Sequence, residues 1–378
     1  MYHAENKFIR DSNLCGIRCI RTAKHMTAPI TRIVPDFALI KETGFDNIID
    51  VRSPSEFLDD HIPRAINLPV LDDSQRTEIG TIYKKINPFE AKRSGAALVA
   101  QNIAGHLQTD LATKNRNWRP LIYCWRGGHR SGAMAKIFSD IGWHCTVIEG
   151  GYKSYRKAVL RDLNCLPAKF RLFVLSGPTG TAKTHILRSA AKDGLQVLDL
   201  EGLANHRGSI LGSEPGSPQP AQRLFESRLC AALQNFRPDR PIFIEAESNK
   251  IGQIHVPPAL WASMRQASRV NLAAPLDARI AFLQRDYRHI IEQPDHLIEL
   301  LAGLRNRYST AVFDRWETFI KAGNWQSFIH NLLETHYDPS YARSRASRPS
   351  NDVLTLSATT LDDDDIRRLA KALSTLDL

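Results

Sequence analysis

The chain reads Leu121-Ile-Tyr-Cys-Trp-Arg-Gly-Gly-His-Arg-Ser-Gly132 at the point that decides its fold. The short apolar run 121–123 predicts a β-strand, and a helical pattern opens at Ser131 and continues from 132 to 141. Between the two lies a loop with two glycines and two arginines. This order predicts a strand, an anion-binding loop and a helix N-terminus, with Cys124 as the first residue of the loop.

Cys124 is placed where a thiol ionises easily. The two loop glycines can adopt backbone angles that other residues avoid, so successive N–H groups can turn inward beside the positive end of the helix. Cations at such a place lower a cysteine pKa from about 8.5 to roughly 3.5–7.5. We therefore predict that Cys124 is catalytic; an ordinary buried cysteine would leave the glycines and arginines unexplained. The predicted oxyanion loop comprises Arg126, Gly127, Gly128, His129, Arg130 and Ser131.

Length and composition restrict the class of protein. A chain of 378 residues is too long for one ordinary core and predicts two domains. No apolar run is long enough to cross a bilayer, and the N-terminus lacks a secretory signal, so we expect a cytoplasmic location without membrane insertion. The six cysteines are scattered, which predicts reduced thiols. A net charge of +10 indicates a polyanionic partner, although charge alone does not establish that it is a nucleic acid.

Motifs around the cysteine loop resemble a known domain. They are Asp50-Val-Arg-Ser-Pro-Ser-Glu-Phe57, His61-Ile-Pro63 and Glu149-Gly-Gly151. Together with the Cys124 loop they resemble a rhodanese domain, which implies a loop cysteine that carries a chalcogen as a persulfide-like adduct. Five residues separate Cys124 from Arg130, where many rhodaneses have four. Rhodanese-like phosphatases share the longer loop, so a phosphatase stays open as an alternative.

A second phosphate-binding motif follows the predicted strand 170–175. Gly177-Pro-Thr-Gly-Thr-Ala-Lys-Thr184 leads into a predicted helix over 185–191, which is the placement that a P-loop requires. Ala182 stands where a glycine is expected before the lysine, and a positive φ there would cost about 1 kcal/mol. The residues predicted to bind phosphate are Gly177, Thr179, Gly180, Lys183 and Thr184, with Thr184 available to Mg²⁺.

Acidic residues end the next two predicted strands, over 196–201 and 241–247. Apolar strands that end in carboxylates are typical of a Walker B strand, which holds magnesium or a water molecule. The alternative is that these are solvated charges at strand ends. The predicted metal or acid–base residues are Asp199, Glu201, Glu245 and Glu247, and we expect no tightly bound cofactor.

Longer motifs identify the chain more closely. They are Asp199-Leu-Glu-Gly-Leu-Ala-Asn-His-Arg-Gly-Ser209, Pro88-Phe-Glu-Ala-Lys92, Gly95-Ala-Ala-Leu-Val99, Glu247-Ser-Asn-Lys-Ile-Gly252 and Tyr337-Asp-Pro-Ser-Tyr341. With the cysteine loop they resemble the tRNA 2-selenouridine synthases, over about residues 33–341. Strands that alternate with helices also predict parallel sheets. The expected fold is α/β: an extension (1–32), a rhodanese-like parallel-sheet domain (33–160), a P-loop NTPase-like domain with a helical C-terminal part (161–341), and a linker with a C-terminal helix (342–378).

The resemblance implies a transferase that acts on wobble uridine 34 of the tRNAs for Lys, Glu and Gln. It implies replacement of the sulfur of 2-thiouridine by selenium from selenophosphate, with S-geranyl-2-thiouridine, made from geranyl diphosphate, as the intermediate. In this family Cys124 would form an S-selanylcysteine, the loop around it would hold selenophosphate, and the P-loop would bind a diphosphate.

A basic connector between the two motifs is where we expect the anticodon arm of the tRNA to bind. It contains Arg156, Lys157, Arg161, Lys169 and Arg171, although a solvated charged face is the alternative. Two other functions stay open: a rhodanese-like phosphatase or sulfurtransferase with a nucleotide-binding regulatory domain, and a non-enzymatic RNA-binding or nucleotide-sensing module. A monomer is expected by default.

Overall fold

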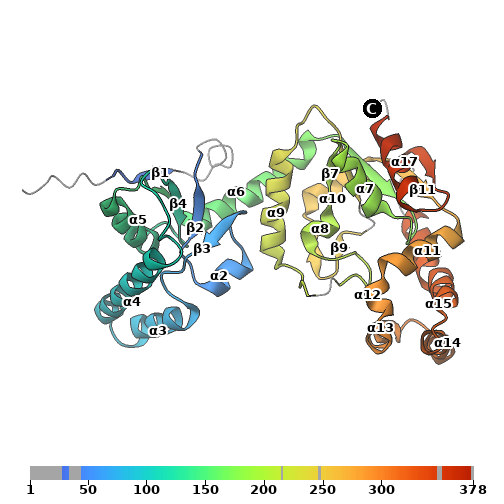
Figure 1. Ribbon diagram of the computed structural model, residues 1–378, viewed down its shortest axis with the longest axis horizontal. Helices are drawn as coiled ribbons and strands as arrows, with labels where there is room; N and C mark the ends of the chain where they lie inside the picture. The colour runs from blue at the N-terminus through green and yellow to red at the C-terminus, as the bar shows by residue number, and fades with distance from the viewer. Residues whose placement is uncertain (1–27, 34–43, 214–215, 246–247, 347–350, 376–378) are drawn as a thin grey trace, which may run out of the picture.

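The computed structural model describes residues 28–33, 44–213, 216–245, 248–346 and 351–375 (Figure 1). Within these ranges no helix combines the length and the apolar character needed to cross a membrane. Glu247 and a short helix predicted over 36–40 lie outside the described residues. The α/β prediction is confirmed, because two separate five-stranded sheets are each covered by helices.

The first sheet has the strand order β1-β5-β4-β2-β3, and all of its strands are parallel. Its strands are β1 (Thr31–Ile33), β2 (Asn47–Asp50), β3 (Ala65–Asn67), β4 (Pro120–Tyr123) and β5 (Thr146–Ile148). Its helices are α2 (Pro54–Asp59), α3 (Asp73–Lys85), α4 (Pro88–Gln108) and α5 (His129–Ile141). The extension predicted over 1–32 was given a C-terminal boundary two residues too late, because β1 begins at Thr31 and pairs with β5.

Helix α5 begins two residues earlier than the sequence pattern predicts, at His129 in place of Ser131. Gly128 is its N-cap, so the backbone N–H groups of His129, Arg130 and Ser131 all lie in the first turn. The first turn of a helix has N–H groups without intrahelical partners. The earlier helix start therefore places more amide groups without intrahelical partners beside the cysteine loop.

Most of the segment predicted as a basic connector folds as a helix, α6 (Gly151–Cys165), which is followed by the 3₁₀ turn η1 (Pro167–Lys169). Tyr155 and Val159 on α6 belong to the same apolar cluster as Phe225 and Leu229 on α9 (Gln222–Asn235). Figure 1 shows α6 between the two halves of the molecule, with α9 beside it. The boundary predicted between 160 and 161 falls inside this helix, and one apolar cluster joins the two halves.

The second sheet has the strand order β12-β11-β6-β8-β7 and is also parallel. Its strands are β6 (Leu172–Ser176), β7 (Gln196–Leu198), β8 (Ile242–Glu245), β11 (Ser268–Ala273) and β12 (Asp352–Ser357). Around it lie α7 (Lys183–Lys192), α8 (Leu200–Ala204), α9, α10 (Pro258–Gln266), α17 (Asp363–Ser374) and the hairpin of β9 (Lys250–Ile251) and β10 (Ile254–His255).

The C-terminal region is part of this second sheet, which the sequence analysis missed. Residues 342–378 were predicted to be a linker and a helix, with 269–273 as the last strand. The structure shows that β12 pairs with β11 and that α17 packs against α7. Leu354 and Leu356 are half-buried and alternate with exposed residues, a period-two pattern that indicates a strand, and the sequence analysis did not recognise it.

A helical subdomain completes the second half. It contains α11 (Leu276–Asp286), α12 (Arg288–Ile291), α13 (Pro294–Leu301), η2 (Ala302–Leu304), α14 (Thr310–Lys321), α15 (Trp325–Leu332) and α16 (Asp338–Ala346). A π-helical turn, η3 (Leu333–Tyr337), lies between α15 and α16. Trp316 is fully buried in the core of this subdomain. Its aromatic residues therefore stabilise the fold, as their helical spacing indicates.

Candidate active sites

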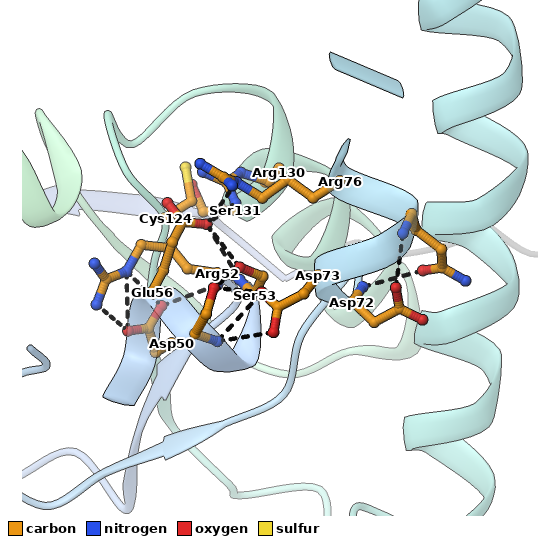
Figure 2. A network of polar contacts seen from close by, with 12 residues as sticks. Asp50, Arg52, Ser53, Glu56, Asp72, Asp73, Arg76, Cys124, Arg130 and Ser131 are labelled. Carbon is orange, nitrogen blue, oxygen red and sulfur yellow. Dashed lines mark hydrogen bonds and ion pairs between the residues drawn. The ribbon is translucent and has the colours of Figure 1, made fainter. Parts of the chain in front are cut away.

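Cys124 lies at the carboxyl end of β4 with its sulfur held by polar groups. Its Sγ accepts a hydrogen bond from Ser131 Oγ at 3.2 Å, and the residue is 3% exposed (Figure 2). Burial raises the pKa of the Cys124 thiol, but hydrogen bonds from the Ser131 hydroxyl and from the N–H groups of Ser131 and Arg126, with the charge of Arg130, outweigh it and lower the pKa. These contacts favour the thiolate, which is the nucleophilic form of cysteine.

The glycines of this site are required where two backbone segments meet. Gly127 has φ +64°, and a Cβ added there would lie 2.3 Å from the Ile148 carbonyl oxygen. Gly151 has φ +57°, and its Cβ would lie 2.2 Å from the Cys124 carbonyl oxygen. The Tyr152 N–H donates to that same oxygen at 2.8 Å. The cysteine loop therefore packs directly on the Glu149-Gly-Gly151 turn, which explains why the two motifs occur together.

Gly128 does not share this requirement. Its φ is −105°, and a Cβ added there would meet no atom within 4 Å. With ψ −125°, Gly128 nevertheless lies outside the ordinary α and β regions, as the prediction of unusual backbone angles for both loop glycines expects.

Glu56 is a residue of this site that the sequence analysis missed. Its Oε2 lies 2.8 Å from Arg130 Nη1 and 3.1 Å from Arg76 Nε (Figure 2). Burial raises the pKa of Glu56, but the Arg130 and Arg76 guanidinium groups lower it more. Glu56 thus holds Arg130 in place beside the loop. The capping box that Glu56 forms with Ser53 was a local signal for a helix start, but it did not reveal this distant partner.

A buried ion pair stabilises the backbone next to the Cys124 loop. Arg52 Nη2 lies 2.6 Å from Asp50 Oδ2 and donates to the Asp60 carbonyl oxygen at 2.5 Å. The guanidinium carbon of Arg52 lies 4.0 Å from the ring centroid of Tyr152, which follows the Gly151 turn. The Asp50-Val-Arg52 motif therefore stabilises the scaffold under the cysteine loop.

The pKa of Cys124 can be tested by the Ser131→Ala substitution. Loss of the hydroxyl donor removes a hydrogen bond to the thiolate, so we expect the pKa of Cys124 to rise. The rate of Cys124 alkylation by iodoacetamide at neutral pH should then fall roughly tenfold, because a hydrogen bond to a charged group contributes about 1.5 kcal/mol or more. Peptide-resolved mass spectrometry across a pH series measures the rate. A midpoint that does not move toward higher pH would contradict the prediction.

Cys145 and Cys230 are internal controls for that experiment. Burial raises the pKa of each thiol to about 12. Both should therefore stay unmodified at neutral pH in the wild-type protein and in the variant.

The P-loop connects β6 to α7 and borders a cavity of about 810 Å³. Lys183 Nζ donates to the carbonyl oxygens of Gly177 at 2.6 Å and Pro178 at 3.3 Å. Ala182 has φ +57°, so the alanine does occupy a left-handed position and accepts a strain of about 1 kcal/mol. Gly180 has φ +86°, and Thr179 accepts a hydrogen bond from Arg279 Nε at 2.8 Å. The loop therefore has the conformation of a phosphate-binding loop.

Two of the predicted acids meet the P-loop. Thr184 Oγ1 lies 2.6 Å from Glu245 Oε2 and 2.9 Å from Glu201 Oε2. Glu245 is 3% exposed, and its Oε1 has no hydrogen-bond partner among the described residues. Burial, together with the charges of Glu201 and Asp199, raises the pKa of Glu245 well above its usual value. A buried carboxylate with a spare oxygen beside a P-loop suits a cation or a shared proton.

Asp199 has a different part in this region. Its carboxylate caps α8 by accepting from the Gly202 N–H at 2.6 Å, and it pairs with Arg188 at 2.8 Å. Each oxygen of Asp199 thus has one protein partner and keeps a further lone pair, so its role as a metal or acid–base residue stays a prediction. No group of three or more His, Cys, Asp or Glu side chains in the described ranges is arranged to bind a metal.

The residues of the basic connector divide into two groups. Lys157, Arg161, Lys169 and Arg171 are exposed, as an RNA-binding surface requires. Arg156 is different, because its side chain is 16% exposed and pairs with Glu226 of α9. Its Nη1 also lies 3.8 Å from Asp60 Oδ2. The prediction of Arg156 as a tRNA-binding residue was therefore wrong, since its charge is used between the two halves of the molecule.

Comparisons with known proteins agree with this architecture. Residues 36–158 match the rhodanese-like domain family, and residues 170–306 match the tRNA 2-selenouridine synthase AAA domain family. Proteins named tRNA 2-selenouridine synthase from Shewanella frigidimarina and Psychromonas ingrahamii are 34% and 31% identical. Each alignment covers 78% of this chain, and 87% and 86% of the respective relative.

Among solved structures, a rhodanese-related protein from Thermoplasma volcanium is 19% identical over 32% of this chain and 85% of its own, with a TM-score of 0.21. The two curated relatives, by contrast, align through both halves of the molecule described above. With a rhodanese-like domain followed by this AAA domain, and relatives of that identity over most of their length, the chain belongs to the tRNA 2-selenouridine synthase family.

Proposed function

We propose that this protein is a transferase that converts 2-thiouridine to 2-selenouridine at wobble position 34 of the tRNAs for Lys, Glu and Gln. The relatives are named for the synthesis of tRNA 2-selenouridine. The observation that carries the proposal is the geometry around Cys124, whose sulfur is surrounded by the Ser131 hydroxyl, the N–H groups of Ser131 and Arg126, and the guanidinium charge of Arg130. A thiolate surrounded in this way can accept a chalcogen atom from an anionic donor.

Selenophosphate is the proposed selenium donor, and Cys124 would carry the selenium as an S-selanylcysteine. In that step the Cys124 thiolate would attack selenium, the S–Se bond would form, the Se–P bond would break, and phosphorus would leave with the bonding pair at the phosphite level. The oxyanion of selenophosphate would be bound by Arg130 and by the amide groups of the first turn of α5. Glu56 holds the Arg130 side chain by an ion pair at 2.8 Å. The oxyanion therefore meets a guanidinium group whose position is already set, which lowers the cost of ordering it.

Geranyl diphosphate is the proposed second substrate, with its diphosphate in the P-loop. The thione sulfur of 2-thiouridine attacks C1 of the geranyl group, the C1–O bond breaks, and diphosphate leaves with the bonding pair. Loss of the N3 proton then gives neutral S-geranyl-2-thiouridine. Alkylation makes sulfur a better leaving group, so selenium can replace it at C2. Lys183 and the loop N–H groups would stabilise the departing diphosphate.

Magnesium fits the residues beside the P-loop. Glu245 has a buried oxygen with no hydrogen-bond partner in the described part of the chain, and Thr184 and Glu201 supply further oxygen ligands. Mg²⁺ prefers oxygen ligands and usually binds through one or two carboxylates together with phosphate oxygens. Thr184, Glu201 and Glu245 would hold the ion, which would neutralise charge on the diphosphate.

The tRNA is proposed to bind along the exposed basic side chains of α6 and the segment after it. Lys157, Arg161, Lys169 and Arg171 lie in the stretch that joins the cysteine half to the P-loop half. An anticodon arm bound there would have the Cys124 loop toward one end and the P-loop toward the other. Net charge of +10 favours the contact with a polyanion.

Reconstitution tests the proposed function directly. The full-length protein is incubated with an anticodon stem-loop that contains 2-thiouridine, first with geranyl diphosphate and then with selenophosphate. Nucleoside mass spectrometry should show S-geranyl-2-thiouridine and then 2-selenouridine. Hydrolysis of a chromogenic phosphate that is blocked by Cys124→Ser, without any change in the RNA, would favour the rhodanese-like phosphatase instead.

A further inference from the structure

A second cavity, almost entirely apolar, lies beside the P-loop cavity. Its volume is about 50 Å³. Four residues line both cavities, namely Thr179, Leu283, Tyr287 and Tyr337. Thr179 belongs to the P-loop itself, so the apolar space begins where the phosphate-binding loop ends. A ligand that extends from one cavity to the other needs an anionic end and an apolar end.

We propose that this cavity binds the end of the hydrocarbon chain of an allylic diphosphate whose diphosphate lies in the P-loop. The inference rests on the proposed function and extends it, because it names the residues that select the chain. The P-loop supplies the anionic half of the site through Lys183 and the loop amides. The apolar cavity supplies the other half.

The lining of the cavity offers little to a polar ligand, because among its residues only Thr179, Tyr287 and Tyr337 have polar side-chain atoms. It is formed largely by aliphatic and phenyl side chains, including Leu211, Ile290, Leu297, Phe328, Ile329 and Leu332. No charged side chain lines it. A cavity with such walls stays dry and binds hydrocarbon, whereas a water molecule needs two to four polar partners. The volume suits the branched end of a short chain, while the carbons nearer the diphosphate would lie in the larger cavity.

Two tyrosines mark the passage between the cavities. Burial raises the pKa of Tyr337 to about 12, and burial, with Tyr337 nearby, raises the pKa of Tyr287 above its usual value. Both rings therefore stay neutral at physiological pH. Neutral aromatic faces attract positive charge. They suit a place beside the allylic carbon, which becomes positive as the C1–O bond breaks.

The two sides of this passage differ in charge: one side carries charged groups and the other is hydrocarbon. On the polar side, the guanidinium carbon of Arg207 lies 5.0 Å from the ring centroid of Tyr287, and Arg207 Nη1 pairs with Asp286 Oδ2 at 2.7 Å. On the other side the walls are hydrocarbon. The π-helical turn η3 brings both Leu333 and Tyr337 to the cavity wall. Single π-helical turns of this kind are frequent at functional sites.

A nucleoside fits these walls poorly. A base and a ribose carry several hydrogen-bonding groups, and each polar group buried without a partner costs about 1–3 kcal/mol. An alkyl chain carries none. The cavity therefore favours an alkyl diphosphate over ATP or GTP as the ligand that spans both spaces.

Binding measurements on the full-length protein test the inference. Isothermal titration calorimetry with Mg²⁺ compares inorganic diphosphate, dimethylallyl diphosphate, geranyl diphosphate and ATP. Burial of about three carbons gives a roughly fiftyfold tighter affinity. We therefore expect geranyl diphosphate to bind about fiftyfold more tightly than inorganic diphosphate, with dimethylallyl diphosphate between them.

A matched pair of substitutions localises the effect. Ile291 lines the cavity, whereas Ile298 is equally half-buried on the neighbouring helix and does not line it. In Ile291→Trp the preference for geranyl diphosphate should fall to within about threefold, and in Ile298→Trp it should persist. The affinity of each variant for inorganic diphosphate reports whether the protein is folded and its P-loop intact.

The outcomes separate the inference from the proposed function. Equal affinity of the wild-type protein for geranyl diphosphate and inorganic diphosphate overturns the inference, and so does tighter binding of ATP or an unchanged preference in Ile291→Trp. If the chain-length preference is found but no geranylated nucleoside forms, the cavity assignment stands and the proposed function fails.

Discussion

Cys124→Ser abolishes 2-selenouridine formation while S-geranylation of the same stem-loop continues within about twofold of the wild-type rate. Serine places an oxygen where Ser131 and the loop amides bind sulfur, but a hydroxyl group is far too weak an acid to be the nucleophile there. Loss of a nucleophile typically reduces turnover by a thousandfold or more. The measurement is nucleoside mass spectrometry after incubation with selenophosphate, starting from S-geranyl-2-thiouridine RNA.

Cys165→Ser is the matched control for this experiment. Cys165 is an exposed free thiol at the end of α6, the helix between the two halves. Its replacement should leave selenation unchanged. Equal loss of geranylation and selenation in Cys124→Ser would contradict the assignment of the two steps to two sites.

Lys183→Ala reduces geranylation by roughly a hundredfold or more, because it removes the cation that reaches the diphosphate. Removal of one group that stabilises developing charge typically costs 10²–10³-fold in rate. Lys183 Nζ donates to loop carbonyls at 2.6 and 3.3 Å, so its amino group lies at the phosphate-binding loop. The measurement is the rate of S-geranyl-2-thiouridine formation at saturating RNA and varied geranyl diphosphate.

The control for this second prediction is Lys192→Ala, at the other end of the same helix. Lys192 is exposed and lies in the last turn of α7, away from the P-loop. The Lys192→Ala variant should form S-geranyl-2-thiouridine at the wild-type rate. Lys183→Ala should still selenate RNA that already carries the S-geranyl group, and failure to do so would show that the P-loop serves the selenium step as well.

The two reaction centres lie in two halves of the molecule that one apolar cluster joins. Tyr152 donates its backbone N–H to the cysteine loop, and its hydroxyl donates to Asp60 at 2.8 Å. Asp60 in turn lies near Arg156, which pairs with Glu226 of the second half. Helix α6, which carries Tyr152 and Arg156, also packs against α9. Substitutions in this interface therefore affect both halves together, and they are poor choices for separating the two steps.

The sequence by itself determined the parts of the molecule that depend on local geometry. The strand, loop and helix around Cys124 and the strand, loop and helix around Lys183 were readable because their glycines, apolar runs and helix starts lie within about fifteen residues. The positive φ that Ala182 needs was likewise implied by its position in the motif. Such features follow from backbone preferences that neighbouring residues share.

Only the tertiary structure decided which distant residues meet. Glu56 binds Arg130 across 74 positions, Gly151 packs on the Cys124 carbonyl, and Arg156 turns inward to Glu226. The strand β12 joins a sheet whose other strands end at Ala273, and the apolar cavity is assembled from several helices. The physical reason is that each of these contacts depends on the register and packing of whole elements, and no local pattern of residues encodes that packing.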